Sequence, residues 1–335
     1  MLFVATSCGN SWLDLEPSTS VDTETSIKIL SDVEFTLNGI YSTMQSSDAY
    51  SGRLIYYGDV TGDDMQAVSS TKRVANYYRF NFTKDDNPSS HWSYLYSIIQ
   101  NCNLILMNID KLVIDEDDKA YRDDLKGEAL AIRGLALFDL TRIFGYPYLK
   151  DDGASLGVPI IEGLSTIDSK PTRNTVAQCY TKIIDDLTQS LSLLGEKFNK
   201  GKINKWGAMV LLSRVYLYKG ENANALKMAS DAIIGAEKNK YALWTNEDYP
   251  TAWGEDASAS KPGEVLFEIV NLTTDSPGKE SMGYLNSYDG YDDMCITCSF
   301  YQFLKEDPKD IRLKLLSFDK KYYAYVNKYQ PQREE

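Results

Sequence analysis

Clustered carboxylates are the residues in this sequence with the most evident capacity for chemistry. Asp59, Asp63 and Asp64 lie close together, and a second acidic run spans residues 115–118. Two carboxylates that face each other across a cleft could hydrolyse a glycosidic bond. A solvated acidic surface also accounts for such groups, and the single histidine, His91, limits any Ser-His-Asp arrangement. We therefore predict that the protein binds a ligand and is not an enzyme.

Two further groups of residues have the types of side chain that bind metals. Cys295 and Cys298 could form a redox pair, half of a zinc site or a local disulfide, or could remain as two free thiols. A zinc site needs two more ligands, so the disulfide and the free thiols stay open as the favoured alternatives. Asp289, Asp292 and Asp293 could contact calcium but lack the spacing of an EF-hand. We predict no metal and no cofactor.

Aromatic residues in the loops offer a different chemistry. The chain contains 24 tyrosines against 11 phenylalanines, and tyrosine combines an apolar ring with a hydrogen-bonding hydroxyl. Sugar rings stack on such side chains, while Asn, Asp and Arg bind sugar hydroxyls. The predicted ligand-binding residues are Trp253, Tyr284, Tyr288, Tyr291, Arg79 and Asp64. Trp92 and Trp206 lie on helical patterns, and we assign them to packing.

Cys8 bears on the cellular location of the protein. The small residues Ala5-Thr6-Ser7 precede Cys8, as they do at the cleavage site of a lipoprotein signal peptide. The predicted lipidation site is therefore Cys8, with residues 1–8 as part of a signal. The alternative is a buried N-terminal segment with an incidental cysteine, because the first basic residue is Lys28 and a signal peptide usually begins with basic residues.

Charge and hydropathy narrow the class of protein. The net charge of -13 disfavours nucleic-acid binding, which depends on clustered Lys and Arg. No stretch approaches the roughly 20 apolar residues that a membrane-spanning helix needs.

Helical periodicity dominates the elements that would position these side chains. Apolar residues recur at three- and four-residue steps, and we predict helices over about 24–45, 91–112, 118–145, 174–195, 205–219, 222–238 and 300–317. Residues 46–90 and 239–300 are predicted to be loop-rich. A strand is predicted at 264–271 and a strand-like segment at 320–329.

The pair of helices at 205–238 fits the 34-residue tetratricopeptide pattern in part. With Ala225 at the central alanine of the pattern, Leu212, Tyr216 and Ala232 occupy three other signature positions. The match predicts two antiparallel helices with small residues where they cross.

Several segments in order resemble the SusD/RagB family of outer-membrane nutrient-binding lipoproteins. They are SCGNSWLDLEPS (7–18), HWSYLYSIIQNCNLIL (91–106), KGEALAIRGLALFDLTRIFGYPYL (126–149), GVPII (157–161), KINKWGAMVLLSRVYLYKGENANAL (202–226) and EVLFEIVN (264–271). The resemblance implies a mainly α, SusD-like fold with tetratricopeptide-type helix pairs, a loop-rich ligand-binding region and a few short strands. Within residues 9–335, the helical scaffold is expected at about 24–238 and the aromatic loop region at about 239–300.

The function that this resemblance implies is glycan capture outside the cell. Such a protein is anchored by lipid to the outer membrane, faces the cell surface and delivers oligosaccharide or polysaccharide to a SusC-like TonB-dependent transporter. The alternative is a helical-repeat protein that binds peptides or protein segments. Family members usually continue into a late helix pair, so we expect a C-terminal part to be missing.

The charged residues of the helix at 118–145 have two interpretations. Glu128, Arg133, Asp139 and Arg142 could present a polar surface to the transporter. We favour structural roles, such as an Asp139–Arg142 pair at i,i+3 or partners for loop backbone.

Overall fold

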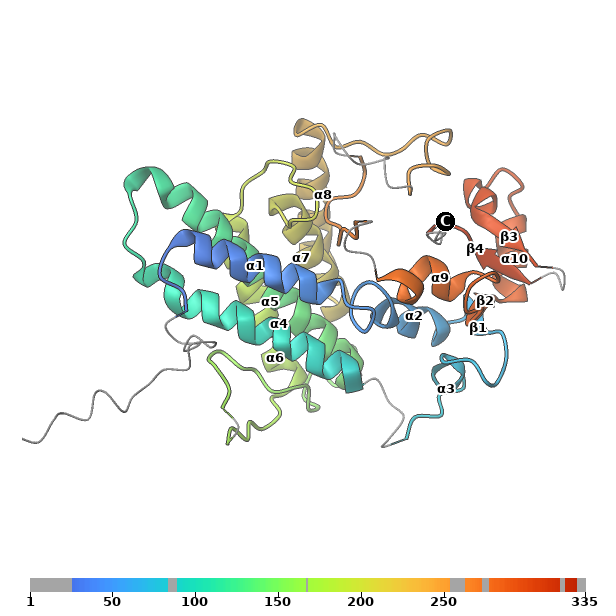
Figure 1. The fold of residues 1–335 in the computed structure, drawn as a ribbon, viewed down its shortest axis with the longest axis horizontal. Coiled ribbons are helices and arrows are strands. Elements are labelled where there is room, and N and C mark those ends of the chain that lie inside the picture. Colours follow the sequence, from blue (N-terminus) through green and yellow to red (C-terminus); the bar gives the residue numbers. More distant parts are fainter. Residues whose placement is uncertain are drawn as a thin grey trace, which may run out of the picture.

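The structure, a computed structural model, describes residues 26–83, 89–166, 168–253, 263–272, 277–319 and 323–329. Figure 1 shows long helices gathered at one end and short helices and strands at the other. The helices are α1 (Leu30–Met44), α2 (Arg53–Val60), α3 (Ala75–Tyr78), α4 (Ser89–Asn108), α5 (Lys119–Phe144), α6 (Val176–Leu193), α7 (Lys205–Lys219), α8 (Asn222–Lys238), α9 (Met282–Asn286) and α10 (Cys298–Lys305). The strands are β1 (Met65–Ala67), β2 (Met294–Ile296), β3 (Leu316–Phe318) and β4 (Ala324–Val326). The predicted mainly α class with a few short strands is confirmed.

The long helices pack in sequence order, α1 on α4, α4 on α5, α5 on α6, α6 on α7 and α7 on α8. Helix α5 lies within this array and is buried almost all round between Leu125 and Thr141. A helix that is covered on every side needs small residues where neighbours approach. Gly127 and Gly134 meet this need, because a Cβ at either position would lie about 3 Å from a leucine of the neighbouring segment.

Local sequence signals explain how the scaffold helices begin and end. Thr175 caps α6 by accepting a hydrogen bond from the Gln178 N–H, and the Gln178 side-chain oxygen accepts a hydrogen bond from the Thr175 N–H. Asn204 caps α7, which ends at Gly220 in the left-handed conformation with φ of 85°. This glycine lets the chain turn directly into α8. The predicted pair at 205–219 and 222–238 is confirmed, with Ala225 and Ala232 buried.

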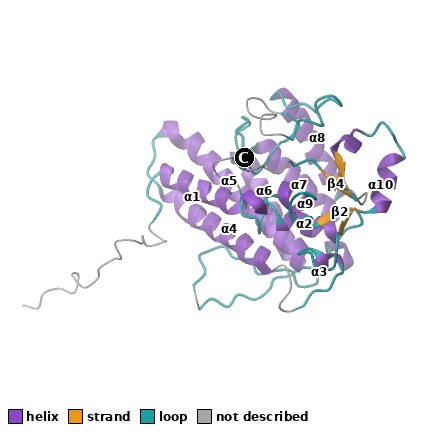
Figure 2. Ribbon diagram, turned by 45° about the vertical axis from the view of Figure 1, so that its right-hand side comes forward, coloured by secondary structure: helices purple, strands orange, loops and turns teal. Residues whose placement is uncertain are grey.

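The end of the molecule opposite the long helices brings together segments that are distant in the sequence. Strand β1 pairs antiparallel with β2, so Met65 lies opposite Ile296, and β3 pairs with β4. A separate apolar core holds these strands against the short helices and comprises Tyr56, Val60, Met65, Val74, Met282, Leu285, Met294, Ile296 and Ala324. Figure 2 shows the strands beside α9 and α10, and Figure 1 shows this end of the molecule away from α1, α4, α5 and α6. The loops that carry most of the predicted ligand-binding residues are attached to this smaller core.

Two predicted elements differ from the structure. The helix predicted at 300–317 ends at Lys305 and resumes only as a short 3-10 segment at Ile311–Leu315, because Pro308 lacks the N–H that would continue the helix. The strand predicted at 264–271 is wrong, since these residues pair with no strand in the described part of the chain. They lie instead against the scaffold, where the Gln45 side chain donates a hydrogen bond to the Val270 carbonyl at 2.5 Å.

Candidate functional site

Trp253 lies in a cluster of aromatic rings from two distant segments. Its ring meets Trp244 edge-on at 4.9 Å between centroids and Tyr249 at 5.6 Å. Tyr329, which follows β4, approaches the same indole at 6.2 Å. The predicted aromatic loop therefore contributes three rings to one site, and the C-terminal segment adds a fourth. We call Trp244, Tyr249, Trp253 and Tyr329 the aromatic cluster.

A cation and carboxylates border the aromatic cluster. The Lys328 ammonium lies over the Trp253 ring, 3.4 Å from its centroid, an arrangement stabilised by the charge distribution of the ring. Burial lowers the pKa of Lys328, while the charges of Glu264 and Asp59 oppose that change. Burial and the charge on Asp64 raise the pKa of Asp59. Asp59 is thus close enough to interact electrostatically with both Asp64 and Lys328.

Tyr284 and Tyr291 form a separate pair. Their rings meet edge-on at 5.1 Å, and the Tyr291 N–H donates to the Tyr284 carbonyl at 3.0 Å. The Arg73 guanidinium covers one face of Tyr291 at 3.9 Å. Tyr291 is exposed and Tyr284 half-buried. Arg73 already occupies one face of Tyr291, which is one of the predicted ligand-binding residues.

Tyr288 packs elsewhere, against Tyr325 of β4 at 5.8 Å. The Tyr325 hydroxyl donates to the Asp292 carboxylate at 2.5 Å, and Lys72 lies 3.5 Å from the same carboxylate. Asp293 is buried and lies 3.2 Å from Arg73 Nε. These basic groups neutralise two of the three aspartates considered for calcium, and the described residues contain no group of three potential ligands around one point.

Arg79 and Asp64 are both exposed. Arg79 follows α3 and precedes Phe80. Asp64 precedes β1, where its carbonyl accepts the Thr297 N–H at 3.0 Å. Asp64 therefore interacts electrostatically with Asp59, while Arg79 lies next to Phe80.

Sequence reasoning missed a second set of exposed rings beside Arg79. Phe80 and Phe82 are exposed and meet edge-on at 6.4 Å. Phe82 also contacts Tyr57 and Tyr77, at 6.2 Å and 5.9 Å. The alternation of aromatic residues in YYRFNF at 77–82 was the available signal.

Ser155 and His91, which are of the types that nucleophilic catalysis uses, are engaged in structural contacts. Residues 153–157 read Gly-Ala-Ser-Leu-Gly, the spacing of a nucleophile elbow, but they form a loop before α6 rather than a turn between strand and helix. The Ser155 hydroxyl is bound to Asp151. His91 is buried, with Nδ1 3.0 Å from the Asp48 carbonyl and its ring against Tyr57 at 5.8 Å. Its environment differs from that of a base beside a nucleophile.

The charged residues of α5 have structural partners, as we favoured. Arg142 pairs with Asp139 at i,i+3, and Arg133 pairs with Asp186 of α6. Glu128 accepts a hydrogen bond from the Tyr41 hydroxyl at 2.6 Å. Glu128, Arg133 and Asp139 are buried and therefore do not form an exposed polar surface.

The cysteines are unpaired in the described part of the chain. Cys102 and Cys179 are buried within the scaffold, in agreement with the helical patterns. Cys295 is buried in β2 and Cys298 is exposed at the start of α10, and both are free thiols. Cys8 lies outside the described residues.

Comparison with known proteins identifies relatives over most of the chain. The family model described as starch-binding and associating with the outer membrane matches residues 11–217. The SusD-like protein P2 of Formosa agariphila is 27% identical over 300 residues, which cover 87% of this chain. The chain spans 55% of the length of that relative.

Solved structures of Bacteroides vulgatus proteins superpose on the chain. A candidate sugar-binding protein is 82% identical, with a TM-score of 0.90 over 93% of this chain and 70% of the other. A SusD superfamily protein is 36% identical, with a TM-score of 0.85 over 92% of this chain and 70% of the other. In the described residues, no helix has both the length and the apolar character required to cross a membrane.

Proposed function

This chain belongs to the SusD-like family, and from that premise we propose that it is a cell-surface lipoprotein that captures a glycan for import. Lipid on Cys8 would hold it at the outer membrane. The captured oligosaccharide or polysaccharide would pass to a SusC-like TonB-dependent transporter. Binding without hydrolysis is part of the proposal.

The observation that carries this proposal is the aromatic cluster around Trp253. Four rings gather there beside the Lys328 ammonium, which interacts with the Asp59 carboxylate. Sugars present apolar C–H faces that pack on aromatic rings and hydroxyls that bond to charged side chains, so the cluster offers both kinds of group. The name of the 82% identical relative, a candidate sugar-binding protein, supports the same ligand class.

Weak binding at such a site is compatible with capture. The exposed part of the cluster is small, since Trp244, Tyr249 and Trp253 are half-buried and Tyr329 is 43% exposed. A single sugar would therefore bury little surface. A lipid anchor that holds the site beside a transporter raises the effective concentration of captured ligand, so a modest affinity suffices.

A calorimetric titration of the chain with a panel of neutral oligosaccharides, acidic oligosaccharides and peptides tests the proposal. We expect saturable binding of at least one oligosaccharide, with no release of reducing sugar. Saturable binding confined to the peptides would contradict glycan capture and favour the peptide-binding alternative. Release of reducing sugar that is lost on changing one carboxylate would show that the protein is an enzyme.

A further inference from the structure

Four aromatic rings gather at the end of α3, apart from the aromatic cluster. Phe80 and Phe82 are 65% and 39% exposed. Tyr57 and Tyr77 lie beside them, with ring centroids 6.2 Å and 5.9 Å from that of Phe82. We call Tyr57, Tyr77, Phe80 and Phe82 the α3 platform. Single exposed apolar residues are normal in folded proteins, whereas several that lie together mark an interaction site.

The two tyrosines attach the α3 platform to the interior. Tyr57 of α2 and Tyr77 of α3 meet edge-on at 5.4 Å between centroids. The buried His91 packs edge-on against Tyr57 at 5.8 Å. The rings are therefore held in position before a ligand arrives, which reduces the conformational entropy lost on binding.

Phe80 has a left-handed backbone conformation, with φ of 54°. The Phe80 N–H donates to the Tyr77 carbonyl at 3.0 Å, and the Asn81 N–H donates to the Asn76 carbonyl at 2.9 Å. These two hydrogen bonds form a Schellman motif, in which glycine usually occupies the left-handed position. A bulky residue is rare there, because its Cβ is crowded by the backbone.

The strained conformation of Phe80 indicates a role for its ring. Glycine would end α3 in the same way without strain, so phenylalanine lowers stability at this position. Burial of the ring does not offset this loss, since most of the side chain is exposed and it meets Phe82 edge-on at 6.4 Å. Strain of this kind persists mainly at functional sites. The conformation thus presents an aromatic ring to solvent in place of a more stable turn.

Hydrogen-bonding side chains adjoin the exposed rings. Arg79 and Asn81 are both exposed and flank Phe80 in the sequence. A sugar presents an apolar C–H face and several hydroxyls, and it therefore fits a surface on which rings and polar groups alternate. The α3 platform has this composition.

Helix α2 connects the α3 platform to the aromatic cluster. Tyr57 belongs to the platform, while Asp59 interacts with Lys328, whose ammonium lies over Trp253. Tyr57 and Asp59 are two residues apart on α2, so their side chains point to opposite sides of it. Both views show α3 below α2 and β4 above it (Figures 1 and 2). The two sites are therefore separated by at least the thickness of a helix, roughly 10–12 Å.

We propose that the α3 platform is a second glycan-binding site, and that the glycan is a polysaccharide or long oligosaccharide that spans this platform and the aromatic cluster. Sugar rings stack on Phe80 and Phe82, and Arg79 donates hydrogen bonds to their hydroxyls. This inference rests on glycan capture as the function. Attachment at two sites raises the affinity for long ligands through effective concentration, and ligands too short to span α2 bind more weakly.

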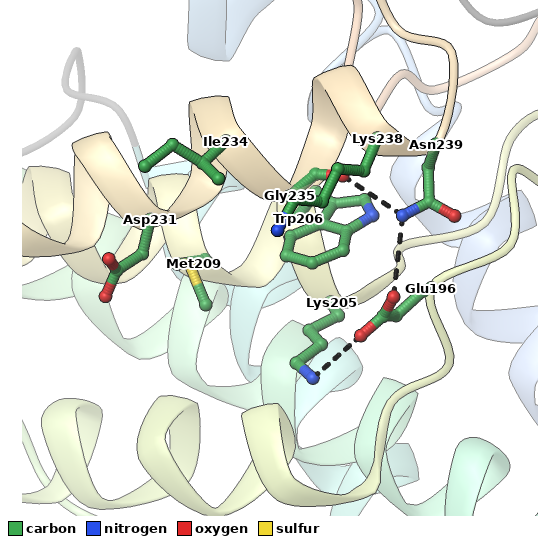
Figure 3. A pocket seen from close by; sticks show the side chains of 9 residues that line it. All are labelled: Glu196, Lys205, Trp206, Met209, Asp231, Ile234, Gly235, Lys238 and Asn239. Carbon is green, nitrogen blue, oxygen red and sulfur yellow. Dashed lines mark hydrogen bonds and ion pairs between the residues drawn. The ribbon is translucent and has the colours of Figure 1, made fainter.

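The cavity of about 340 Å³ between α7 and α8 offers a contrast. Trp206 is the single aromatic residue among the described residues that line it, and Figure 3 shows this indole beneath Gly235. A Cβ on Gly235 would lie 2.0 Å from the Trp206 ring, so the backbone of α8 covers the surface on which a sugar would stack. Ile234 lines the same cavity and is 53% exposed. Substitution of Ile234 therefore removes an exposed apolar side chain away from the α3 platform.

Calorimetry tests the proposal. Electrophoresis in gels cast with soluble starch, a β-glucan, a mannan or a pectin first identifies a polysaccharide that retards the parent chain. We expect the parent to bind this polysaccharide at least about tenfold more tightly than the matching trisaccharide. The double substitution Phe80→Gly and Phe82→Ala should remove that preference. Ile234→Ala is the matched control and should retain it.

Thermal unfolding of Phe80→Gly separates lost binding from lost folding. We expect this variant to melt at or above the temperature of the parent, because glycine relieves the strained backbone and the ring that is removed is mostly exposed. A variant that melts well below the parent would assign the ring to packing and overturn the proposal.

The binding results distinguish this proposal from glycan capture itself. A folded double variant that keeps the full preference for the polysaccharide would overturn the second site, leave glycan capture standing and make a protein partner the better occupant of the platform. A parent chain that binds no polysaccharide and no oligosaccharide would overturn both.

Discussion

Arg133 of α5 binds Asp186 of α6 through two parallel hydrogen bonds in the interior of the scaffold. Arg133 Nε lies 2.8 Å from Oδ2 and the second guanidinium nitrogen lies 2.6 Å from Oδ1. The remaining terminal nitrogen donates to Asn103 of α4 at 2.8 Å, and Lys182 lies 3.2 Å from the same aspartate. The network thus links the consecutive scaffold helices α4, α5 and α6, in a region where none of the charged groups is fully solvated.

Removal of Arg133 should therefore destabilise the scaffold severely. Arg133→Ala leaves the fully buried Asp186 carboxylate without its bidentate partner, and breaking a buried pair in this way costs about 3–5 kcal/mol. Urea denaturation followed by circular dichroism measures the loss. Lys119→Ala, which breaks the exposed Lys119–Glu116 pair, is the control and should cost less than about 1 kcal/mol. Equal losses for both variants would contradict this account.

Glu128 should make stability depend on pH. Burial raises the pKa of Glu128 from its ordinary value of 4.5 to about 7 in the folded chain. The folded state therefore holds a proton that the unfolded state releases, so this residue's contribution to stability is complete below pH 4.5 and declines as the pH rises to about 7.

Substitution of Glu128 by Gln tests this dependence. Gln keeps an acceptor for the Tyr41 hydroxyl but cannot ionise. We expect a flatter stability profile between pH 4.5 and 7 and greater stability than the parent at pH 8, by at most about 3 kcal/mol. Urea denaturation at a series of pH values gives the comparison, and parallel profiles for the two proteins would refute the assignment.

Two helical glycines should respond in opposite directions to alanine. Gly235→Ala should destabilise the protein by about 1–3 kcal/mol, because its Cβ would overlap the Trp206 ring. Gly39 lies on the exposed side of α1, where an alanine Cβ would have no neighbouring atom within 4 Å, and Gly39→Ala should stabilise by about 0.5–1 kcal/mol. Thermal unfolding of the two variants under one condition checks both signs. A stabilising Gly235→Ala would mean that Trp206 moves freely.

Cys8 should determine membrane attachment. We expect the full chain, expressed with a complete lipoprotein signal in a bacterium with an outer membrane, to incorporate labelled palmitate and to sediment with membranes. Cys8→Ser should remove both the label and the sedimentation, since each buried CH₂ of an acyl chain contributes about 0.8 kcal/mol. Cys298→Ser is the matched control and should retain both. Label that persists in Cys8→Ser would exclude this residue as the anchor.

The scaffold was predictable from the sequence because its helices are marked by local features, namely capping residues and a regular apolar period. The bounds of the pair at 205–219 and 222–238 agree with the structure, since Asn204 and Gly220 cap α7 and the apolar period is unbroken. The strand at 264–271 was wrong because an apolar run does not reveal whether a partner strand exists. Val270 and Asn271 instead form hydrogen bonds with Gln45 and Ser51 of the scaffold.

The candidate site was predictable only in part. Trp253 stood out as a tryptophan in a loop, but its neighbours Lys328 and Tyr329 are distant in sequence. They reach it because β3 and β4 return the end of the described chain toward α2. Single-sequence patterns do not report such long-range contacts. Tyr284 and Tyr288 were both predicted to bind ligand, yet the turn between them directs the two rings to different partners.

The most direct test of glycan capture compares two single substitutions by calorimetry with the oligosaccharide that the parent chain binds best. Trp253→Ala removes the centre of the aromatic cluster, and we expect at least about a tenfold loss of affinity, because stacking on one ring contributes on the order of 1 kcal/mol and the cluster would lose its organisation. Tyr146→Ala is the control, because Lys150 lies 3.1 Å over that exposed ring in the same kind of contact, on the scaffold. Affinity that falls only for Trp253→Ala supports the account. Unchanged affinity in a folded Trp253→Ala variant would contradict it and place the ligand elsewhere.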